Sequence, residues 1–481
     1  MKKTLVAVAV LLPFLFMLMA CPGKQEKPDV VSSNNATPWM VPVEVADTPN
    51  ATENDYYNFG WQTFIALNWP ASLSYRGKPD SSLALGAKDA TGNMYPAVWE
   101  TWKEQYDIFL ANAINPGPWN WMLQNNAAPV KVLRMFSKND SNRVFDAFNQ
   151  ATGEPLIDQD SQFVRYEVRT NESEYTYYLN NKYYNADSQI NAVANNRFVG
   201  FPKGNDSLSK SLPAWAQFGA TEIKASWKVF KPNTPATILE RYFHRSAILI
   251  DQYGNKGAPV EVGLVGLHIL RLTPTTGSSW YWASFEQVDN LELQPQYGGT
   301  LPPSPTFNTN PVKLYGDSGY SYKPASITFG KPLPPAIPVG VCSPPFLQSN
   351  PQLDSINKLY TQSVKGTPFQ YYQMIGTVNP PGKGGSSYTN VDSRNKYPSV
   401  TVNTSWLANS TMETYMIPSG VQLANNNCIT CHISGYPQMP ANTPTPYSGN
   451  YQIFTFLPRL AQSSSMKKVM PVDFVLVRGK K

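Results

Sequence analysis

Cysteine and histidine are scarce in this chain, which has 4 Cys and 3 His among 481 residues. A structural zinc site needs four ligands arranged as a tetrahedron, usually supplied as two pairs of Cys or His. One group of this kind occurs, at 428–432, and no second Cys or His pair is present to complete it. The scarcity therefore argues against a zinc site.

Charged residues are also few, at 15% of the chain, and the formal net charge is +6. No run of Lys and Arg with interleaved aromatic residues occurs, so no nucleic-acid partner is predicted. Hydrophobic residues reach 42% and aromatic residues 13%, which is enough for a substantial core and excludes a disordered polymer. The 43 Pro indicate long ordered loops, common in exported β-rich proteins.

A long hydrophobic run occurs at the N-terminus, over residues 5–20, and Lys2 and Lys3 precede it. The length of this run and the presence of Pro13 argue against a permanent membrane span. Residues 1–20 are therefore predicted to be an export signal peptide.

The end of this run, residues 18–20 followed by Cys21, resembles a bacterial lipobox. The resemblance implies that Cys21 becomes the first mature residue and carries lipid, which tethers the protein to a membrane without spanning it. Pro22 follows, instead of the Asp that favours retention at the inner membrane, so the outer membrane is favoured, with the protein in the periplasm or at the cell surface. The alternative is an ordinary signal peptide in which Cys21 is incidental, and both interpretations predict export.

The clearest chemical signal is the CxxCH sequence at 428–432. Two thiols at this spacing can each add across a vinyl group of haem, and the adjacent imidazole is then placed to ligate the iron. We therefore predict one covalent haem c, with thioether links to Cys428 and Cys431 and with His432 as the proximal iron ligand. A CxxC disulfide, redox-active or structural, is the alternative in an oxidising compartment. The remaining thiol, Cys342, is predicted to be a small buried apolar group.

The sixth iron ligand decides what such a haem can do. A Met ligand favours a high potential, a His ligand a lower one, and an open site allows small molecules to bind. His268 is the first candidate and His244 a lesser one, since they are the other two imidazoles. Met412 and Met439 are the alternative sulfur ligands because both lie near the CxxCH sequence.

A strand predicted at 260–272 gives His268 an apolar face, on which Gly266 leaves room for a planar neighbour. The structural alternative is a buried histidine that a backbone carbonyl satisfies. The residues predicted to share the face of His268 are Val262, Leu264, Gly266 and Leu270.

Hydrophobic periodicity predicts an α+β fold, with N-terminal helices packed on a central, mainly antiparallel β-meander. Long Pro- and Gly-rich loops and a C-terminal haem-attachment segment are expected to follow. Thr52 and Asp55 predict a capping box at the start of a helix over 52–68, which Pro70 stops. Further helices are predicted at 97–112 and 411–416. Alternating patterns predict strands at 222–229, 242–250, 260–272 and 279–287, with a short apolar piece at 371–378.

The domain organisation predicted from composition has three parts. Residues 1–20 form the signal peptide, residues 21–50 a flexible tether, and residues 51–481 a single interleaved domain. The alternative divides the last part into an α+β body at 51–330 and a haem-attachment region at 331–481.

Five stretches of the chain carry a family resemblance: 59–70, 263–269, 282–290, 371–377 and 407–415. In this order, and followed by the CxxCH sequence, they resemble the motifs of a bacterial family of large exported cytochrome c-type proteins, most of them uncharacterised. The resemblance spans about residues 54 to 460 and implies a haem protein of unusual size, not a small all-helical cytochrome domain joined to something else. Gln287 stands where this family has His, which weakens a metal-binding role for that position.

Two redox functions follow from these observations. The favoured one is a membrane-tethered electron carrier with a redox protein as its unknown partner, because one haem suffices and no catalytic acid or base is needed. The alternative is a haem enzyme that activates peroxide or another small oxidant, which needs a nearby proton-transfer group such as Glu286, Glu413 or His244. A third hypothesis, outside redox chemistry, is a lipoprotein whose surface Trp and Tyr contact carbohydrate or polymer.

Overall fold

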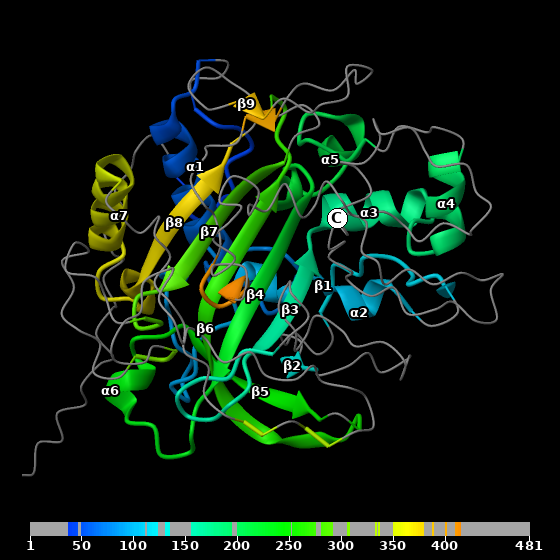
Figure 1. The fold of residues 1–481 in the computed structure, drawn as a ribbon. Helices are drawn as coiled ribbons and strands as arrows, with labels where there is room; N and C mark the ends of the chain where they lie inside the picture. Colours follow the sequence, from blue (N-terminus) through cyan, green and yellow to red (C-terminus); the bar gives the residue numbers. More distant parts are fainter. Residues whose placement is uncertain are drawn as a thin grey trace, which may run out of the picture.

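The chain forms an α+β structure in which helices surround a curled, mainly antiparallel sheet (Figure 1). This computed structural model describes residues 37–46, 50–110, 113–123, 130–134, 155–194, 200–251, 253–275, 280–291, 305–307, 350–379 and 409–414. It also describes the short pieces 332–333, 335–336, 387–388 and 400–401.

The sheet is built around one long strand, β6 (Lys256–Arg271). One edge of β6 pairs with β4 (Thr221–Val229), and the other edge pairs first with β5 (His244–Ile250) and then with β7 (Tyr281–Gln287). β6 therefore joins two parts of the sheet, one that continues through β5 and one that continues through β7. The remaining strands of this sheet are β1 (Lys103–Glu104), β2 (Val132–Leu133), β3 (Arg165–Thr170) and β8 (Tyr372–Val378). The strand order is β1-β3-β4-β6-β5-β2, and β7 and β8 extend the sheet from β6. A separate pair joins β9 (Ser387–Tyr388) to β10 (Val400–Thr401).

The strands predicted from alternation are confirmed as β4, β5, β6 and β7, with ends that differ by a few residues. The apolar piece predicted at 371–378 is β8. Alternation predicted them well because Ile223, Ala225 and Trp227 of β4 are fully buried on one face. The pairing of β2 with β5 is parallel, whereas the other pairings of the main sheet in the described ranges are antiparallel.

Helix α1 (Glu53–Leu67) confirms the helix predicted at 52–68. The carboxylate of Asp55 accepts hydrogen bonds from the N–H and from the hydroxyl of Thr52, both at 2.7 Å, which satisfies groups at the start of the helix. The other helices are α2 (Gln105–Ile108), α3 (Glu172–Asn180), α4 (Ala186–Ala194), α5 (Ser207–Lys210), α6 (Ala236–Leu239) and α7 (Pro351–Ser363).

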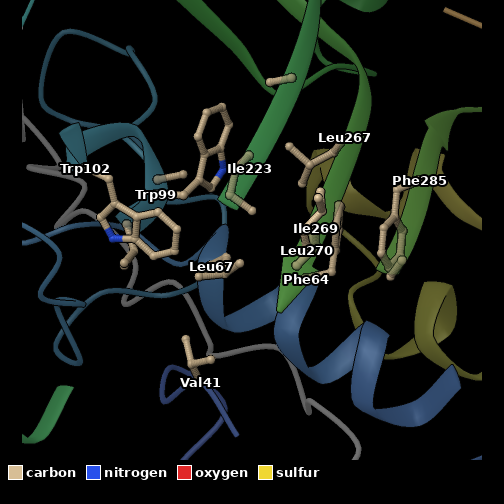
Figure 2. Packing of buried hydrophobic residues seen from close by; sticks show 14 of the residues in the cluster. Val41, Phe64, Leu67, Trp99, Trp102, Ile223, Leu267, Ile269, Leu270 and Phe285 are labelled. Atoms are coloured by element: carbon tan, nitrogen blue, oxygen red, sulfur yellow. The ribbon is translucent and has the colours of Figure 1, made fainter. Parts of the chain in front are cut away.

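The main core lies between α1 and one face of the sheet (Figure 2). Phe64 of α1 stacks on Phe285 of β7 with ring centroids 4.2 Å apart, and Trp61 meets the same ring edge-on at 5.1 Å. All three side chains are fully excluded from solvent. Because burying each such side chain contributes about 1.5–3 kcal/mol, these contacts fix α1 against the sheet.

The helix predicted at 97–112 is wrong. A short 3-10 turn at Val98–Thr101, the two-residue β1 and the single turn of α2 replace it. The guanidinium of Arg169 donates to the carbonyl oxygen of Trp102 at 2.9 Å, and Arg76 donates to that of Thr101. These carbonyls therefore have side-chain partners in place of helical N–H groups, while the aromatic residues at helical spacing are still buried.

The flexible tether predicted at 21–50 is wrong for residues 37–46, which pack on the body of the protein. Val41 and Val45 are buried in the main core. The guanidinium of Arg271 donates to the carbonyl oxygen of Pro42 at 2.7 Å, so the backbone of this segment is fixed as well.

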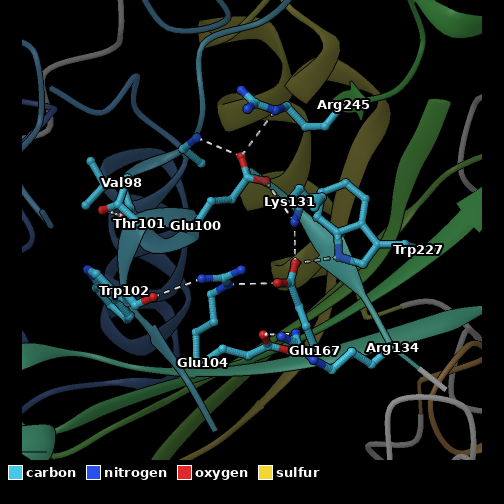
Figure 3. Close-up of polar contacts among 12 residues, drawn as sticks. Val98, Glu100, Thr101, Trp102, Glu104, Lys131, Arg134, Glu167, Trp227 and Arg245 are labelled. Carbon is cyan, nitrogen blue, oxygen red and sulfur yellow. Dashed lines mark hydrogen bonds and ion pairs between the residues drawn. The ribbon is translucent and has the colours of Figure 1, made fainter. Parts of the chain in front are cut away.

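A buried network of charged side chains crosses the core side of the sheet (Figure 3). The ammonium of Lys131 lies 2.9 Å from Glu100 and 2.5 Å from Glu167, and it sits 4.0 Å from the centroid of the Trp227 ring. Arg169 makes a second ion pair with Glu167 at 2.7 Å. These cations hold the pKa of Glu167 down at about 2, although burial alone would raise it. The network keeps its charges paired where solvent cannot reach them.

Candidate functional site

Much of the predicted haem site lies outside the described residues, and the assigned roles there stay predictions. The residues concerned are Cys21, Cys342, Cys428, Cys431, His432 and Met439. The other candidates lie inside the described part, and the structure shows which of them come together. These are His244, His268, Glu286, Met412 and Glu413.

The face of the sheet opposite α1 carries rows of polar residues. In β4, β6 and β7, Lys224, His268 and Ser284 stand directly opposite one another. Directly opposed residues of antiparallel strands point to the same face. The next row along the same strands consists of Ser226, Gly266 and Glu286.

A β-bulge in β6 places His268 and some of the residues predicted to share its face on opposite faces of the sheet. The pairing of β6 with β4 skips Val265, so that Leu264 stands opposite Trp227. Val262 and Leu264 therefore belong to the main core, whereas Val265 packs in a second apolar cluster. The prediction of a face shared with His268 is therefore wrong for Val262 and Leu264, which the bulge turns to the other side, whereas Gly266 and Leu270 lie on the same face as His268.

The turn at 409–414 covers this polar face, and Figure 1 shows it in orange against β4 and β6. The side-chain amide of Asn409 donates to the carbonyl oxygen of Phe285 at 3.0 Å. The hydroxyls of Thr411 and Ser226 lie 2.6 Å apart, and both residues are fully buried. The turn is therefore fixed to β4 and β7 by hydrogen bonds out of contact with water.

Only residues 411–414 of the helix predicted at 411–416 are described; there the chain forms a turn through Met412, and Thr414 has the 3-10 conformation. The side-chain oxygen of Asn409 accepts hydrogen bonds from the backbone N–H of Thr411 at 2.9 Å and from its hydroxyl at 2.7 Å. The backbone N–H of Glu413 also donates to the carbonyl oxygen of Asn409 at 2.8 Å, so Asn409 makes the hydrogen bonds of a residue that caps the start of a helical turn. Residues 415–416 lie outside the described residues.

Gly266 permits the close approach of the turn to the sheet. A Cβ atom at Gly266 would lie 2.4 Å from the hydroxyl oxygen of Thr411 and 2.6 Å from that of Ser226. Because neither separation is tolerable for a real Cβ, glycine is the residue that fits here. The space predicted beside His268 is thus occupied by the chain's own turn.

His268 contacts Glu413 of the turn. Its Nε2 lies 3.0 Å from one carboxylate oxygen of Glu413 and 3.2 Å from the other. Burial alone would raise the pKa of Glu413, but the charge and hydrogen bond of His268, together with Lys224, hold this pKa below its usual value. An ionised carboxylate can only accept, so Nε2 of His268 carries the hydrogen.

Glu286 is the second buried carboxyl group at the turn. Its two oxygens accept hydrogen bonds from the backbone N–H and from the hydroxyl of Ser410, each at 2.6 Å. Burial raises the pKa of Glu286 to about 7, the charge of Glu413 adds to this effect, and the bonds from Ser410 oppose it. Glu286 can therefore gain or lose a proton near neutral pH.

Two other candidate residues do not join this polar group. Met412 is fully buried in the second apolar cluster, with Tyr166 and Val265 among its members. His244 lies on β5, where its Nδ1 is 2.9 Å from a carboxylate oxygen of Glu261. Met412 as a sulfur ligand stays a prediction that the described contacts do not test.

Gln287 has a structural environment of its own. Its side-chain oxygen accepts from the backbone N–H of Asp289, and its amide lies 3.2 Å from the carbonyl oxygen of Arg241. Asp289 in turn forms an ion pair with Arg241. The amide of Gln287 also lies 3.3 Å from a carboxylate oxygen of Asp289, so Gln287 supports the chain after β7 through hydrogen bonds.

Sequence reasoning did not predict that His268 and Glu413, 145 positions apart, would meet. The one signal is the order of the resembling stretches, because 263–269, 282–290 and 407–415 all contribute to this face. The contacting residues that the sequence did not single out are Lys224, Ser226, Asn409, Ser410 and Thr411.

His268 could ligate iron through one of its two ring nitrogens. In the neutral form of His268, with the hydrogen on Nε2 toward Glu413, Nδ1 has the lone pair, and a carboxylate that accepts from the other ring nitrogen orients metal-bound histidines. Across the described ranges, no group of three or more His, Cys, Asp or Glu side chains could hold a metal ion by itself. Nor does any helix in those ranges have the length and apolar composition to cross a membrane.

Comparisons of this chain with protein-family models, with curated proteins and with solved structures found no match in any of the three.

Proposed function

We propose that this chain is an exported c-type cytochrome, tethered to a membrane by lipid on Cys21 and carrying one covalent haem, that acts in electron transfer. The observation that carries the proposal is the CxxCH sequence at 428–432, which combines two attachment thiols with an adjacent iron ligand. The haem would supply a reversible one-electron couple. The N-terminal signal supports the proposal, because in bacteria haem is attached to such sequences outside the cytoplasm.

We expect the haem-bearing segment to lie near the polar face of the sheet. The turn at 409–414 is fixed to that face, and fourteen positions separate Thr414 from Cys428. Fully extended, this connection reaches at most about 50 Å, so the attachment thiols lie within that distance of the turn. We infer a single interleaved domain, in which β-sheet and haem segment belong to one unit.

In this proposal His268 would hold the iron as its sixth ligand, through Nδ1. Glu413 would hold the ring orientation through Nε2 and make the imidazole a stronger donor. Met412 and Met439 are the alternative ligands, and Met412 would have to leave its apolar cluster to serve.

A second candidate function is a haem enzyme that activates peroxide or another small oxidant. Glu286 favours it, because a buried carboxyl group with a pKa of about 7 can hold or release a proton at neutral pH. The His268–Glu413 contact on the same face provides a further group able to hold a proton.

Haem staining after denaturing electrophoresis tests the proposal. Exported protein from a strain competent for cytochrome maturation should keep a haem-stained band, and Cys428→Ser should weaken or abolish it. Cys342→Ser is the matched control and should leave the band unchanged. Absence of covalent haem in the unaltered protein would end the proposal.

Two spectroscopic measurements then decide between carrier and enzyme. Carbon monoxide added to the reduced protein should leave the spectrum of a carrier with two protein ligands unchanged, whereas rapid binding would favour the enzyme. His268→Ala should convert a low-spin spectrum to a high-spin one, and His244→Ala should not. An unchanged spectrum in His268→Ala would make His268 a structural residue.

A further inference from the structure

A loop on the surface, residues 113–123, presents large apolar side chains to solvent. Ile114 is 58% exposed, Trp121 47% and Met122 60%. Leu123 and Trp119, by contrast, are buried at the base of the same loop. Exposed apolar side chains grouped in this way mark an interaction surface, because a soluble protein gains nothing by presenting them to water.

The loop is held rigidly in this arrangement. The Trp119 ring lies 5.5 Å from the ring of Tyr175 and 5.6 Å from the guanidinium carbon of Arg76. The backbone N–H of Arg76 donates to the carbonyl oxygen of Trp121 at 2.7 Å, and the hydroxyl of Tyr175 donates to that of Gly117 at 2.6 Å. The apolar side chains are therefore preorganised, and binding would not need to order them.

Two residues of the loop also have an unusual backbone conformation. Ala113 and Asn120 adopt left-handed conformations, with φ of 54° and 57°, which residues other than glycine seldom adopt. Asn120 directly precedes Trp121, whose indole N–H donates to Glu172. Strained residues of this kind concentrate at functional surfaces.

Basic side chains surround the apolar ones. The ammonium of Lys78 lies 5.1 Å from the ring centroid of Tyr75 and 5.2 Å from that of Trp215, and Tyr75 pairs with Met122. The ammonium of Lys103 lies 5.4 Å from the ring centroid of Tyr175. The guanidinium of Arg76 donates to the carbonyl oxygens of Thr101 and Asn120, so Lys78 and Lys103 are the two ammonium groups that form the basic rim of the loop.

Two acidic groups lie nearby but do not cancel this charge. Glu172 accepts a hydrogen bond from the indole N–H of Trp121 at 2.5 Å, and burial raises its pKa to about 7. Asp107 is close enough to act on Arg76 and Lys103. The surface therefore combines Trp, Met and Ile with a positive rim.

We propose that the loop at 113–123 docks on an anionic lipid surface, with Trp121 and Met122 in the headgroup region and the basic rim facing lipid phosphates. Tryptophan with aliphatic neighbours and Lys or Arg is the composition that binds at membrane interfaces.

The lipid on Cys21 would allow this contact, and to that extent the inference rests on the proposed function. Sixteen positions separate Cys21 from Thr37, where the described body begins, and this chain reaches at most about 55 Å. A connection that long does not fix the orientation of the body relative to the membrane. Docking of the loop would fix which side of the protein faces the membrane.

Tryptophan quenching in vesicles tests the docking. The purified lipidated full chain is reconstituted in phosphatidylethanolamine–phosphatidylglycerol vesicles whose acyl chains carry bromine, which quenches indoles that enter the membrane. We expect quenching in the unaltered chain and its loss in Trp121→Phe, which keeps the apolar contact but removes the reporter. Trp39→Phe, at a residue that packs on Trp69 of the body, is the control and should keep the quenching.

Two further arms separate the possible results. Replacing phosphatidylglycerol by phosphatidylcholine should reduce the quenching, because the basic rim loses its anionic partner. Flotation with vesicles reports the lipid anchor separately, and Met122→Glu should abolish quenching while flotation persists. Quenching that is absent, or equal in Trp121→Phe, would overturn the docking. The docking would also be overturned if the only effect of Met122→Glu were the loss of a copurifying protein, because the loop would then bind a protein and not lipid.

Discussion

Glu286 makes the stability of this protein depend on pH in a way that a single substitution should reveal. Its carboxyl group is buried under the turn at 409–414, and its pKa rises from an ordinary value of 4.5 to about 7. A carboxyl group with a raised pKa in the folded state stabilises the fold fully below its unfolded pKa. This contribution is lost as the pH rises through the folded pKa.

The magnitude follows from the size of this rise. A difference of about 2.5 pKa units corresponds to roughly 3 kcal/mol at 1.36 kcal/mol per unit, as an order of magnitude. Glu286→Gln mimics the protonated acid, because its amide oxygen can accept from the N–H of Ser410 and its NH₂ can donate to the hydroxyl. The free energies of unfolding of the two proteins should therefore be similar at pH 4, and the variant should be more stable by roughly 3 kcal/mol at pH 8.

Urea unfolding at a series of pH values from 4 to 8 measures this difference. Comparing the variant with the unaltered chain isolates Glu286, because burial raises the pKa of Glu104 to about 7 and of Asp158 to about 6 in both proteins. Glu240→Gln, at an exposed residue after α6, is the control and should change nothing. Parallel stability curves for Glu286→Gln and the unaltered chain would refute the reasoning.

Two other substitutions test the contacts that build the site and the core. Gly266→Ala should destabilise the fold by about 1–3 kcal/mol in urea unfolding, because the new methyl group overlaps Thr411. Gly257→Ala is its control: the nearest atom to the new methyl group is 3.5 Å away, so the free energy of unfolding should change by less than about 0.5 kcal/mol. Lys131→Met should lower the free energy of unfolding by about 3–5 kcal/mol, because among the described residues buried Glu100 then keeps only Arg245, at 4.0 Å, as a cationic partner, and buried Glu167 keeps only Arg169. The exposed Lys231→Met serves as its control, and equal losses from the two would contradict a special role for the buried lysine.

The sequence predicted those elements whose signals are local. The strands of the sheet have period-two patterns that survive in the fold, and α1 has a capping residue, an apolar face and a following Pro70. The helix expected at 97–112 failed because distant side chains, Arg76 and Arg169, bind its carbonyl oxygens. No pattern within 97–112 contains that information.

The site was predictable in its parts but not in its arrangement. His268 stands out as one of three histidines, yet its polar surroundings depend on a bulge at Val265 that alternation conceals. Glu286 and Glu413 are candidates by residue type, and it is the turn at 409–414 that brings them to one face. Contacts across more than a hundred positions are set by tertiary packing, which periodicity does not report.

Intact mass spectrometry of the exported polypeptide tests the central claim most directly. The account predicts the added mass of one iron protoporphyrin, retained after denaturation and localised by digestion to the peptide that contains Cys428, Cys431 and His432. A mass showing these two cysteines free, or bridged to each other, with no porphyrin attached would contradict it.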